Sequence, residues 1–328
     1  MEVSTAKKTI GAVVGAVTLV VSVVVSLAIA EGVLRLQNSS MNNYDIEMWR
    51  YGKELKIPSE NPLLGNEHKR FASAMLQSVQ IRLNDWGLRG KPVRFSTPGN
   101  RRILFLGGSI TLGWGVKEED TVTAQIEKQF AEHGQQVEVL NAGVGNYNAP
   151  RYVERFLKDL TPLQPTDLVV HYFLRDAEAL ERGGGNVVLR HSELAVTLWT
   201  LANRVLSRTS DTAIVDHYKA VYEPSNPGFA AMVQALERLS GYAKQNKIRL
   251  YLAMTPDVHN LKNYQLGRVH ETMRGIAERL GYVYVDFLPA LRGLPPESIW
   301  AMPGDPHPNA LGHRRMAEAL YPVLATVR

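Results

Sequence analysis

The sequence predicts an α/β fold in which helices cover both faces of a parallel sheet. From about residue 98 onward, short apolar segments alternate with longer amphipathic segments. This alternation is typical of repeated strand–helix–strand units, which form parallel sheets. Residues 98–328 are therefore expected to form one α/β domain, and the chain of 328 residues is long enough to bury its core.

The alternation places five strands and five helices in this region. The strands are predicted at residues 102–106, 137–140, 167–173, 248–254 and 282–287. The helices are predicted at residues 120–132, 152–160, 229–245, 268–280 and 309–327.

Residues 176–225 interrupt this order. An amphipathic helix is predicted within them at residues 191–208, and its apolar face carries Leu194, Leu198, Leu201 and Val205. We interpret this helix as packed on the domain, and a lid or a partner surface is the alternative.

The N-terminus contains a predicted membrane anchor at residues 9–30, a stretch without any charged residue. About 20 apolar residues in a helix cross a bilayer. Lys7 and Lys8 precede the stretch, which favours a cytoplasmic N-terminus at residues 1–8 and an extracytoplasmic domain. This predicts a single-pass inner-membrane protein with its main domain in the periplasm. Residues 31–97 are expected to form a linker and an N-terminal extension.

A cleaved signal peptide is the alternative for the same stretch. Ala28-Ile29-Ala30 has the small-x-small form of a cleavage site. However, the apolar stretch is longer than the 7–15 residues or so that signal peptides use. Both interpretations export the domain.

Composition excludes several classes of function. The chain has no cysteine, which excludes disulfides, thiolate catalysis and cysteine-bound zinc. The formal net charge is +5, but Lys and Arg are scattered along the sequence and form no basic stripe. Nucleic-acid binding is therefore not expected.

A candidate nucleophile follows the first predicted strand. In "ILFLGGSITLGWGV", residues 103–116, the strand runs into Gly107, Gly108 and Ser109. Ligands of a parallel sheet bind beyond the carboxyl ends of its strands. A serine hydroxyl becomes a nucleophile only when a base accepts its proton and a third group orients that base.

The segment "GDPHPNALGH", residues 304–313, contains a candidate base and orienter. Asp305 lies two residues before His307, and in an extended segment such side chains point to the same side. Pro306 lies between them and stiffens the backbone. The alternative is a surface turn that caps the following helix. Two further polar segments, "NAGVGNYN" at 141–148 and "YFLRDAE" at 172–178, end the second and third strands.

Together these segments resemble the blocks of the SGNH/GDSL hydrolase family over about residues 80–328. "LNDWGLRG" and "RRILFLGGSITLGWGV" resemble its first strand and nucleophile block, and "NAGVGNYN" resembles its glycine block. "DLVVHYFLRDAE" is similar to its third block and "DPHPNALGHRRMAEALY" to its histidine block. Within that family, the sequence is similar to a subgroup of membrane-anchored or exported proteins that are encoded with exopolysaccharide machinery.

The resemblance implies a three-layer α/β/α sandwich around a flavodoxin-like five-stranded parallel sheet. It implies Ser109 as nucleophile, His307 as general base and Asp305 as the residue that orients it. The backbone N–H groups of Ser109 and Gly145 and an asparagine side chain of the third block would bind the oxyanion. The resemblance implies no metal and no cofactor.

The sequence departs from the family pattern at two positions. Gly108 replaces the aspartate of Gly-Asp-Ser. That aspartate has a mainly structural role in the family, and glycine is tolerable in its place. Arg175 stands where the third block has its asparagine, so the expected oxyanion donor is missing. A guanidinium could stabilise the oxyanion, bind an acidic sugar, fill the pocket or turn outward. Asn146 and Asn148 are candidates to replace the missing donor and to bind substrate.

Trp114, which follows the serine, is a candidate wall of the acyl pocket. The predicted function is an extracytoplasmic serine esterase that removes acyl groups, chiefly O-acetyl, from a polysaccharide through an acyl-Ser109 intermediate. The alternatives are a polysaccharide O-acetyltransferase and a non-catalytic glycan-binding scaffold of an export complex. Expected partners are the acylated glycan, the membrane through residues 9–30, and exopolysaccharide assembly proteins.

Overall fold

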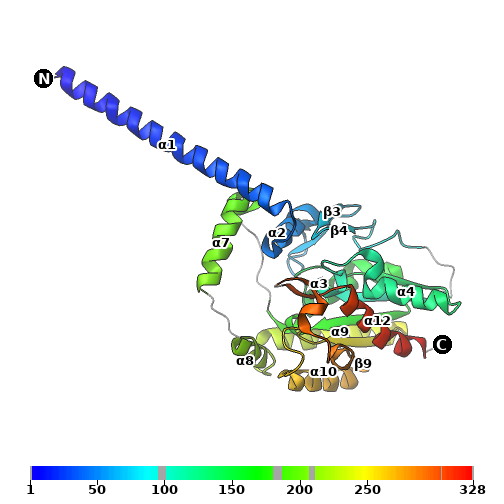
Figure 1. Ribbon diagram of the computed structural model, residues 1–328. Coiled ribbons are helices and arrows are strands. Elements are labelled where there is room, and N and C mark those ends of the chain that lie inside the picture. The colour runs from blue at the N-terminus through cyan, green and yellow to red at the C-terminus, as the bar shows by residue number, and fades with distance from the viewer. Residues whose placement is uncertain (1, 95–100, 180–186, 207–210, 304, 327–328) are drawn as a thin grey trace. The chain divides into compact units, whose positions relative to one another are not determined.

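The computed structural model describes residues 2–94, 101–179, 187–206, 211–303 and 305–326 (Figure 1). The chain forms two compact units: Met1–Trp49 with Gly184–Arg208, and Arg50–Gly183 with Thr209–Arg328. The larger unit includes residues 50–94. The predicted boundary between residues 97 and 98 lies outside the described residues.

A five-stranded parallel sheet forms the centre of the larger unit, as predicted. Its strand order is β6-β5-β7-β8-β9. The strands are β5 (Arg101–Gly107), β6 (Val137–Asn141), β7 (Asp167–Phe173), β8 (Arg249–Thr255) and β9 (Val283–Asp286). Each lies within two residues of its predicted bounds, because fully buried strands carry uninterrupted apolar patterns.

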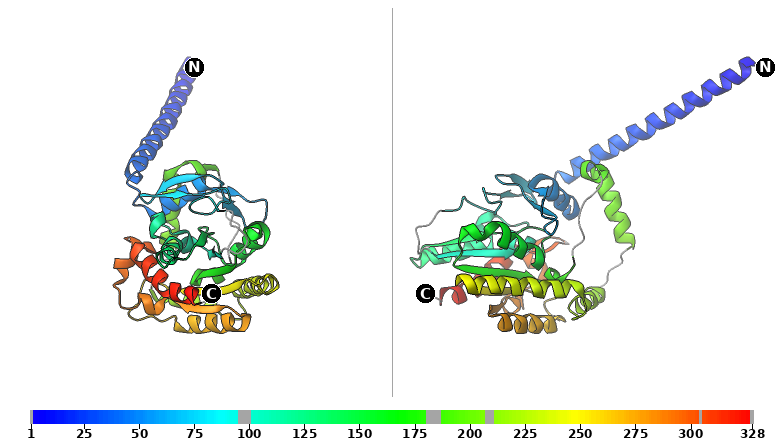
Figure 2. Two further views of the ribbon diagram at one scale, coloured as in Figure 1. Left: turned by 90° about the vertical axis from the view of Figure 1, so that its right-hand side faces the viewer. Right: turned by 180° about the vertical axis from the view of Figure 1, so that it is seen from behind.

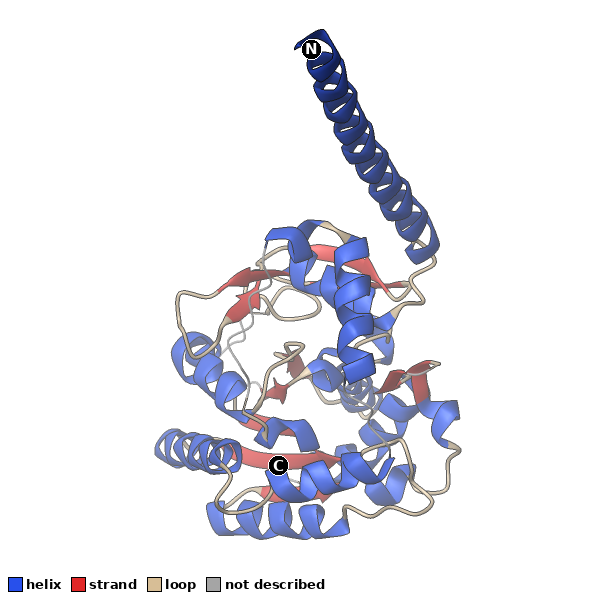
Figure 3. Ribbon diagram, turned by 90° about the vertical axis from the view of Figure 1, so that its left-hand side faces the viewer, coloured by secondary structure: helices blue, strands red, loops and turns tan. Residues whose placement is uncertain are grey.

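Helices cover both faces of this sheet (Figure 3). Leu104 and Leu106 of β5 pack with the helices of one face, and Ile103 and Phe105 pack with those of the other. The first face is covered by α5 (Ala149–Arg155), α9 (Pro227–Asn246) and α10 (Gly267–Leu280). The second is covered by α4 (Val122–Glu132) and α12 (Ala310–Ala325). In the right view of Figure 2, α9 (yellow) runs along its face of the sheet.

Side-chain caps determine where several of these helices begin. The Asn226 side chain accepts a hydrogen bond from Gly228 N–H at 2.9 Å, so α9 begins two residues before its predicted start. Asn309 caps α12 in the same way, through Leu311 N–H at 3.0 Å. Helix α5 begins after its cap Asn148 and continues as a π-helical turn, η2 (Phe156–Leu160).

Short elements complete the larger unit. They are α3 (Ser109–Leu112), η1 (Glu118–Asp120), η3 (Thr161–Leu163), η4 (Leu174–Ala177), α8 (Asp211–Val221), α11 (Leu288–Leu291) and η5 (Pro296–Ile299). Three antiparallel pairs also occur: β1 (Lys56–Pro58) with β2 (Asn66–His68), β3 (Ser73–Leu76) with β4 (Val79–Arg82), and β10 (Trp300–Met302) with β11 (Asp305–Pro308).

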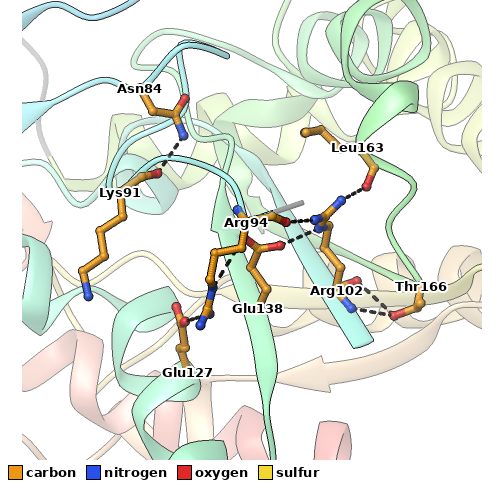
Figure 4. Close-up of polar contacts among 8 residues, drawn as sticks. All are labelled: Asn84, Lys91, Arg94, Arg102, Glu127, Glu138, Leu163 and Thr166. Carbon is orange, nitrogen blue, oxygen red and sulfur yellow. Dashed lines mark hydrogen bonds and ion pairs between the residues drawn. The ribbon is translucent and has the colours of Figure 1, made fainter. Parts of the chain in front are cut away.

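A buried ion pair joins the amino ends of β5 and β6 (Figure 4). Arg102 Nε donates to Glu138 Oε2 at 2.6 Å, and the Arg102 guanidinium also donates to the carbonyl oxygens of Leu163 and Arg94. The Arg94 N–H donates to the second Glu138 oxygen at 2.6 Å. These bonds satisfy a buried cation that the scattered charges of the sequence do not reveal, and they hold residues 91–94 against the sheet.

The smaller unit is helical. It contains α1 (Glu2–Asn38), α6 (Val187–His191) and α7 (Glu193–Leu206), and the first residues of α2 (Tyr44–Leu55). Within α1, the segment Ile10–Asn38 has a mean hydropathy of 2.7 in its most apolar window, and none of that window is buried. By length and composition this helix is a candidate membrane span.

Candidate active site

A sharp turn between β5 and α3 presents Ser109 at the carboxyl edge of the sheet. Strand β5 ends at Gly107, and α3 begins at Ser109. A Cβ atom at Gly107 would lie 2.0 Å from Thr111 Oγ1 and 2.7 Å from the His171 carbonyl oxygen. Only glycine therefore fits at the end of the strand, which explains one of the two glycines before the serine.

The structure brings Ser109 and His307 together from opposite ends of the domain. Ser109 Oγ and His307 Nε2 are 2.7 Å apart, although the two residues are 198 positions apart in sequence. His307 Nδ1 lies 2.5 Å from Asp305 Oδ1. An ionised carboxylate can only accept, so Nδ1 carries the imidazole proton and Nε2 accepts a hydrogen bond from the Ser109 hydroxyl.

Strand β11 fixes the spacing of Asp305 and His307. Its pairing with β10 keeps the backbone extended, so side chains two residues apart lie on one side. The His307 N–H also donates to Asp305 Oδ1 at 3.1 Å. The expected contact between these two residues is thus present, and Asp305 is completely buried.

Gln77 is a third partner of this carboxylate and was not predicted. It lies in the two-residue turn between β3 and β4, where Gln77 and Ser78 have φ angles of +47° and +59°. Gln77 Nε2 donates to Asp305 Oδ2 at 3.0 Å and contacts Met302 Sδ at 3.1 Å. Both oxygens of Asp305 are therefore hydrogen-bonded.

These bonds decide the charge of Asp305. Burial alone would raise the pKa of its carboxyl, but the hydrogen bonds from His307 and Gln77 and the attraction of His307 hold that pKa below its ordinary value. Asp305 is consequently ionised at neutral pH and can hold the imidazole in one tautomer.

Arg89 supports the short helix that carries Ser109. Its Nη1 donates to the carbonyl oxygens of Leu112 and Gly113 at 2.7 and 2.6 Å, and its Nη2 donates to Val116 O at 2.6 Å. The Arg89 N–H donates to Asn141 O at 3.0 Å, which ties the segment to β6. A buried guanidinium thus satisfies the carbonyl groups at the end of α3.

The backbone of Gly145 is held by residues that precede the sheet. Its N–H donates to the Tyr51 hydroxyl at 2.8 Å, and its carbonyl oxygen accepts from Lys56 Nζ. A Cβ atom at this position would lie 2.6 Å from Tyr51 Cε1, so glycine is required. The N–H group that the sequence suggests for the oxyanion is therefore bonded to Tyr51 in this structure.

Tyr51 belongs to a buried hydrogen-bond chain. Its hydroxyl lies 2.6 Å from His68 Nε2, and His68 Nδ1 lies 2.9 Å from Gly87 O. Because the Gly87 carbonyl can only accept, His68 Nδ1 carries the proton and Nε2 accepts from Tyr51. Burial lowers the pKa of His68 well below its ordinary value, so the chain is neutral.

Asn146 and Asn148 lie in different surroundings. Asn148 is buried; its side-chain oxygen accepts from Arg151 N–H at 3.2 Å, and its amide donates to Glu178 O at 2.8 Å. Asn148 therefore caps α5. Asn146 is exposed and has a φ of +62°. The segment around it packs on the serine turn, since Val144 N–H donates to Gly107 O at 3.1 Å.

Arg175 lies at the surface, in η4 after β7. Its Nε donates to Glu178 Oε2 at 3.2 Å, and 53% of its side chain is exposed. The next residue, Asp176, is buried; it accepts from Phe173 N–H at 3.1 Å and from the Tyr152 hydroxyl at 3.2 Å. Burial raises the pKa of Asp176 to about 8, so it braces this turn as a neutral acid.

Trp114 packs in the core and does not form an open wall. Only 1% of it is exposed, and its ring contacts the Tyr51 ring edge-on with centroids 5.6 Å apart. Its Nε1 atom is buried and has no hydrogen-bond partner within the part of the chain that the structure describes.

A model of the GDSL-like lipase/acylhydrolase family matches residues 105–315, more than half of the 328 residues. No curated protein sequence matches the chain.

Solved structures also resemble it. TesA is 16% identical with a TM-score of 0.44, over 70% of this chain and 100% of TesA. A two-domain esterase active on acetylated mannans is 20% identical, with a TM-score of 0.44 over 70% of this chain and 49% of that protein. The acetyl xylan esterase AlAXEase is 17% identical, with a TM-score of 0.42 over 68% and 99%.

These identities and TM-scores are low, so the assignment rests on the family model, whose match begins in β5 and ends in α12. That match contains both Ser109 and His307. The chain belongs to the GDSL-like lipase/acylhydrolase family.

Proposed function

We propose that Ser109, His307 and Asp305 form the nucleophile, general base and orienting residue of a serine esterase that removes O-acetyl groups from an extracytoplasmic polysaccharide. The observation that carries this proposal is the unbroken chain of contacts from Ser109 Oγ to His307 at 2.7 Å and from His307 to Asp305 at 2.5 Å. This is the arrangement that activates a hydroxyl for acyl transfer.

In the first half of the reaction, His307 Nε2 takes the Ser109 hydroxyl proton while Oγ attacks the ester carbonyl carbon. The tetrahedral oxyanion then collapses, the bond between the carbonyl carbon and the sugar oxygen breaks, and His307 returns its proton to that oxygen. The products of this half are a free sugar hydroxyl and acyl-Ser109. Asp305 stays ionised and stabilises the imidazolium.

In the second half, water replaces the sugar. His307 takes a proton from the water, which attacks the acyl carbon, and the proton then goes to Ser109 Oγ as the acyl bond breaks. Acetate leaves and the serine is regenerated. If a glycan hydroxyl took the place of water, the same acyl-enzyme would transfer its group.

For the oxyanion we propose the Ser109 N–H and the Asn146 side-chain amide. Asn146 is exposed beside the serine turn. The Asn148 amide already donates to Glu178 O, and the Arg175 guanidinium donates to the Glu178 carboxylate at the surface. Gly145 remains a candidate donor only where the Tyr51 hydroxyl releases its N–H. Removal of one such donor commonly lowers kcat by about 10²–10³.

We further propose that α1 anchors the enzyme as a single-pass span with the esterase outside the cytoplasm. Its length and apolar composition support the span, and Lys7 and Lys8 before it support the orientation. The polysaccharide is proposed from the resemblance to exported exopolysaccharide-associated proteins.

Full-length protein in detergent, incubated with p-nitrophenyl acetate, tests the esterase. We expect turnover that is lost in Ser109→Ala, and turnover that persists in this variant would contradict the mechanism. Acetylated polysaccharide tests the substrate by release of acetate. Acetyl transfer to an added glycan, at the expense of released acetate, would assign the transferase instead.

A further inference from the structure

We propose that α7 is an interfacial helix that lies on the bilayer surface beside the anchor, with its apolar face in contact with lipid. Its sequence separates two faces. By helical spacing, Leu198, Trp199, Leu201 and Ala202 share one side, whereas Glu193, Thr197 and Thr200 share the other. An amphipathic helix of this kind binds in the interfacial plane of a membrane.

The apolar face is uncovered in the structure. Leu198, Trp199 and Leu201 are 56%, 57% and 57% exposed. Val188 in the preceding α6 is 63% exposed. Three large apolar side chains exposed within four residues of one helix indicate a surface that another phase or molecule covers.

Hydrogen bonds fix the beginning of α7 to α1 just after the apolar stretch ends. The Glu31 carboxylate accepts from the N–H groups of Glu193 and Leu194 at 3.0 and 2.9 Å and from Ser192 Oγ at 2.9 Å. Asn38 Nδ2 donates to Glu193 Oε2 at 2.8 Å. A carboxylate that accepts from the first N–H groups of a helix is a stable cap.

This attachment is what selects lipid as the occupant. Residues 9–30 carry no charge, and Glu31 is the first charged residue after them. A span through this stretch therefore puts Glu31, and with it the start of α7, at the boundary between lipid and water. From there α7 runs away from α1 crosswise (Figure 1), the direction that a helix on the bilayer surface takes.

Tryptophan is suited to this position. Its ring is apolar and its N–H is polar, so Trp is enriched where membrane proteins meet the interface. The inference rests on the proposed membrane anchoring, but it adds a second attachment that is independent of the esterase chemistry.

Single cysteines test the proposal cleanly, because the chain has none of its own. Leu198→Cys and Thr200→Cys, in the full chain, place an environment-sensitive fluorophore on the apolar and polar faces of α7. Val20→Cys reports on α1. The labelled proteins are reconstituted in vesicles of phosphatidylethanolamine and phosphatidylglycerol, and quenching by aqueous iodide and by spin-labelled lipid is compared.

We expect lipid-borne quenching at Val20→Cys and Leu198→Cys, and iodide quenching at Thr200→Cys. Failure of the protein to float with vesicles, or no lipid quenching at Val20→Cys, would overturn the anchor and the inference together. Lipid quenching at Val20→Cys but iodide quenching at Leu198→Cys would overturn the interfacial helix alone. Protection of Leu198→Cys from both quenchers would also overturn it and assign the face to protein.

Discussion

The Gln77 amide donates to the Asp305 oxygen that His307 leaves free, at 3.0 Å. A residue of the N-terminal region thus completes the hydrogen bonding of a carboxylate 228 positions later in sequence. Since Asp305 acts only through His307, Gln77 is a positioning residue in the proposed mechanism.

Gln77→Leu should lower kcat by about tenfold or more while KM changes little, because a hydrogen bond to a charged group is worth about 1.5–3 kcal/mol. Loss of this bond should also raise the pKa of Asp305, because burial alone favours the protonated carboxyl. As the pH is lowered, the activity of Gln77→Leu should therefore begin to fall at a higher pH than that of the natural protein. Steady-state kinetics from pH 4 to pH 9 measure both effects. Gln80→Leu is the matched control, because Gln80 is exposed on the same hairpin. An equal loss in both variants would mean that the hairpin is merely disturbed.

Asn146→Ala should lower kcat by about 10²-fold, as loss of an oxyanion donor does. Asn148→Ala should instead lower the free energy of unfolding by about 1 kcal/mol, the usual cost of a lost N-cap, with turnover within about threefold. Arg175→Asn should also leave turnover within about threefold, because its guanidinium lies on Glu178. A loss of kcat of about 10²-fold in Arg175→Asn, with no loss in Asn146→Ala, would assign the oxyanion donor to Arg175 and not to Asn146.

Tyr51→Phe should destabilise the protein by about 1–3 kcal/mol, because it leaves the buried Gly145 N–H and His68 Nε2 without a partner. Urea unfolding measures the difference. Tyr321→Phe is the control, since the described residues give that hydroxyl no hydrogen bond. Equal stability of Tyr51→Phe and the natural protein would contradict the hydrogen-bond chain.

Asp176→Asn should change how stability depends on pH. The folded-state pKa of Asp176 is raised to about 8 from an ordinary value of 3.8, so its contribution is complete below about pH 4 and is lost as the pH rises through 8. Between these two pH values, each rise of one pH unit lowers the free energy of unfolding of the natural protein by about 1.4 kcal/mol relative to Asp176→Asn, which does not ionise.

Urea unfolding of both proteins at pH 5, 6, 7 and 8 checks this dependence. Asn keeps an acceptor oxygen for Phe173 and Tyr152, so the hydrogen bonds survive. Asp216→Asn serves as the control, because 75% of that side chain is exposed. Parallel stability curves for the natural protein and Asp176→Asn would show that the carboxyl is ionised when folded.

The sheet and the contact between His307 and Asp305 could be predicted from the sequence for simple physical reasons, whereas the pairing of Ser109 with His307 was implied by the resemblance to the family. Buried parallel strands are apolar throughout, and side chains two residues apart on a strand share a side. The contributions of residues 50–94 were not accessible. The Gln77-Ser78 turn contains neither glycine nor asparagine, the usual signs of a two-residue hairpin, so nothing local marked it.

Tyr51 and Arg89 were missed for a related reason. Both act by hydrogen bonds to backbone groups of distant segments, Gly145 for one and the end of α3 for the other. Every residue has the same backbone groups, so a side chain that bonds to the backbone requires no particular residue type at the other position. Spacing and composition therefore do not reveal such a contact. Interpreting residues 31–97 as a linker and extension followed from their lack of long apolar patterns.

The central claim is that Ser109 carries the acyl group. Full-length protein mixed with p-nitrophenyl acetate, quenched in acid within the first turnovers and digested for mass spectrometry, tests it directly. We predict an acetyl group on Ser109, absent from Ser109→Ala and formed far more slowly in His307→Ala. Steady turnover with no acetyl group on Ser109 in the quenched samples, or with the acetyl group on another residue, would contradict the account.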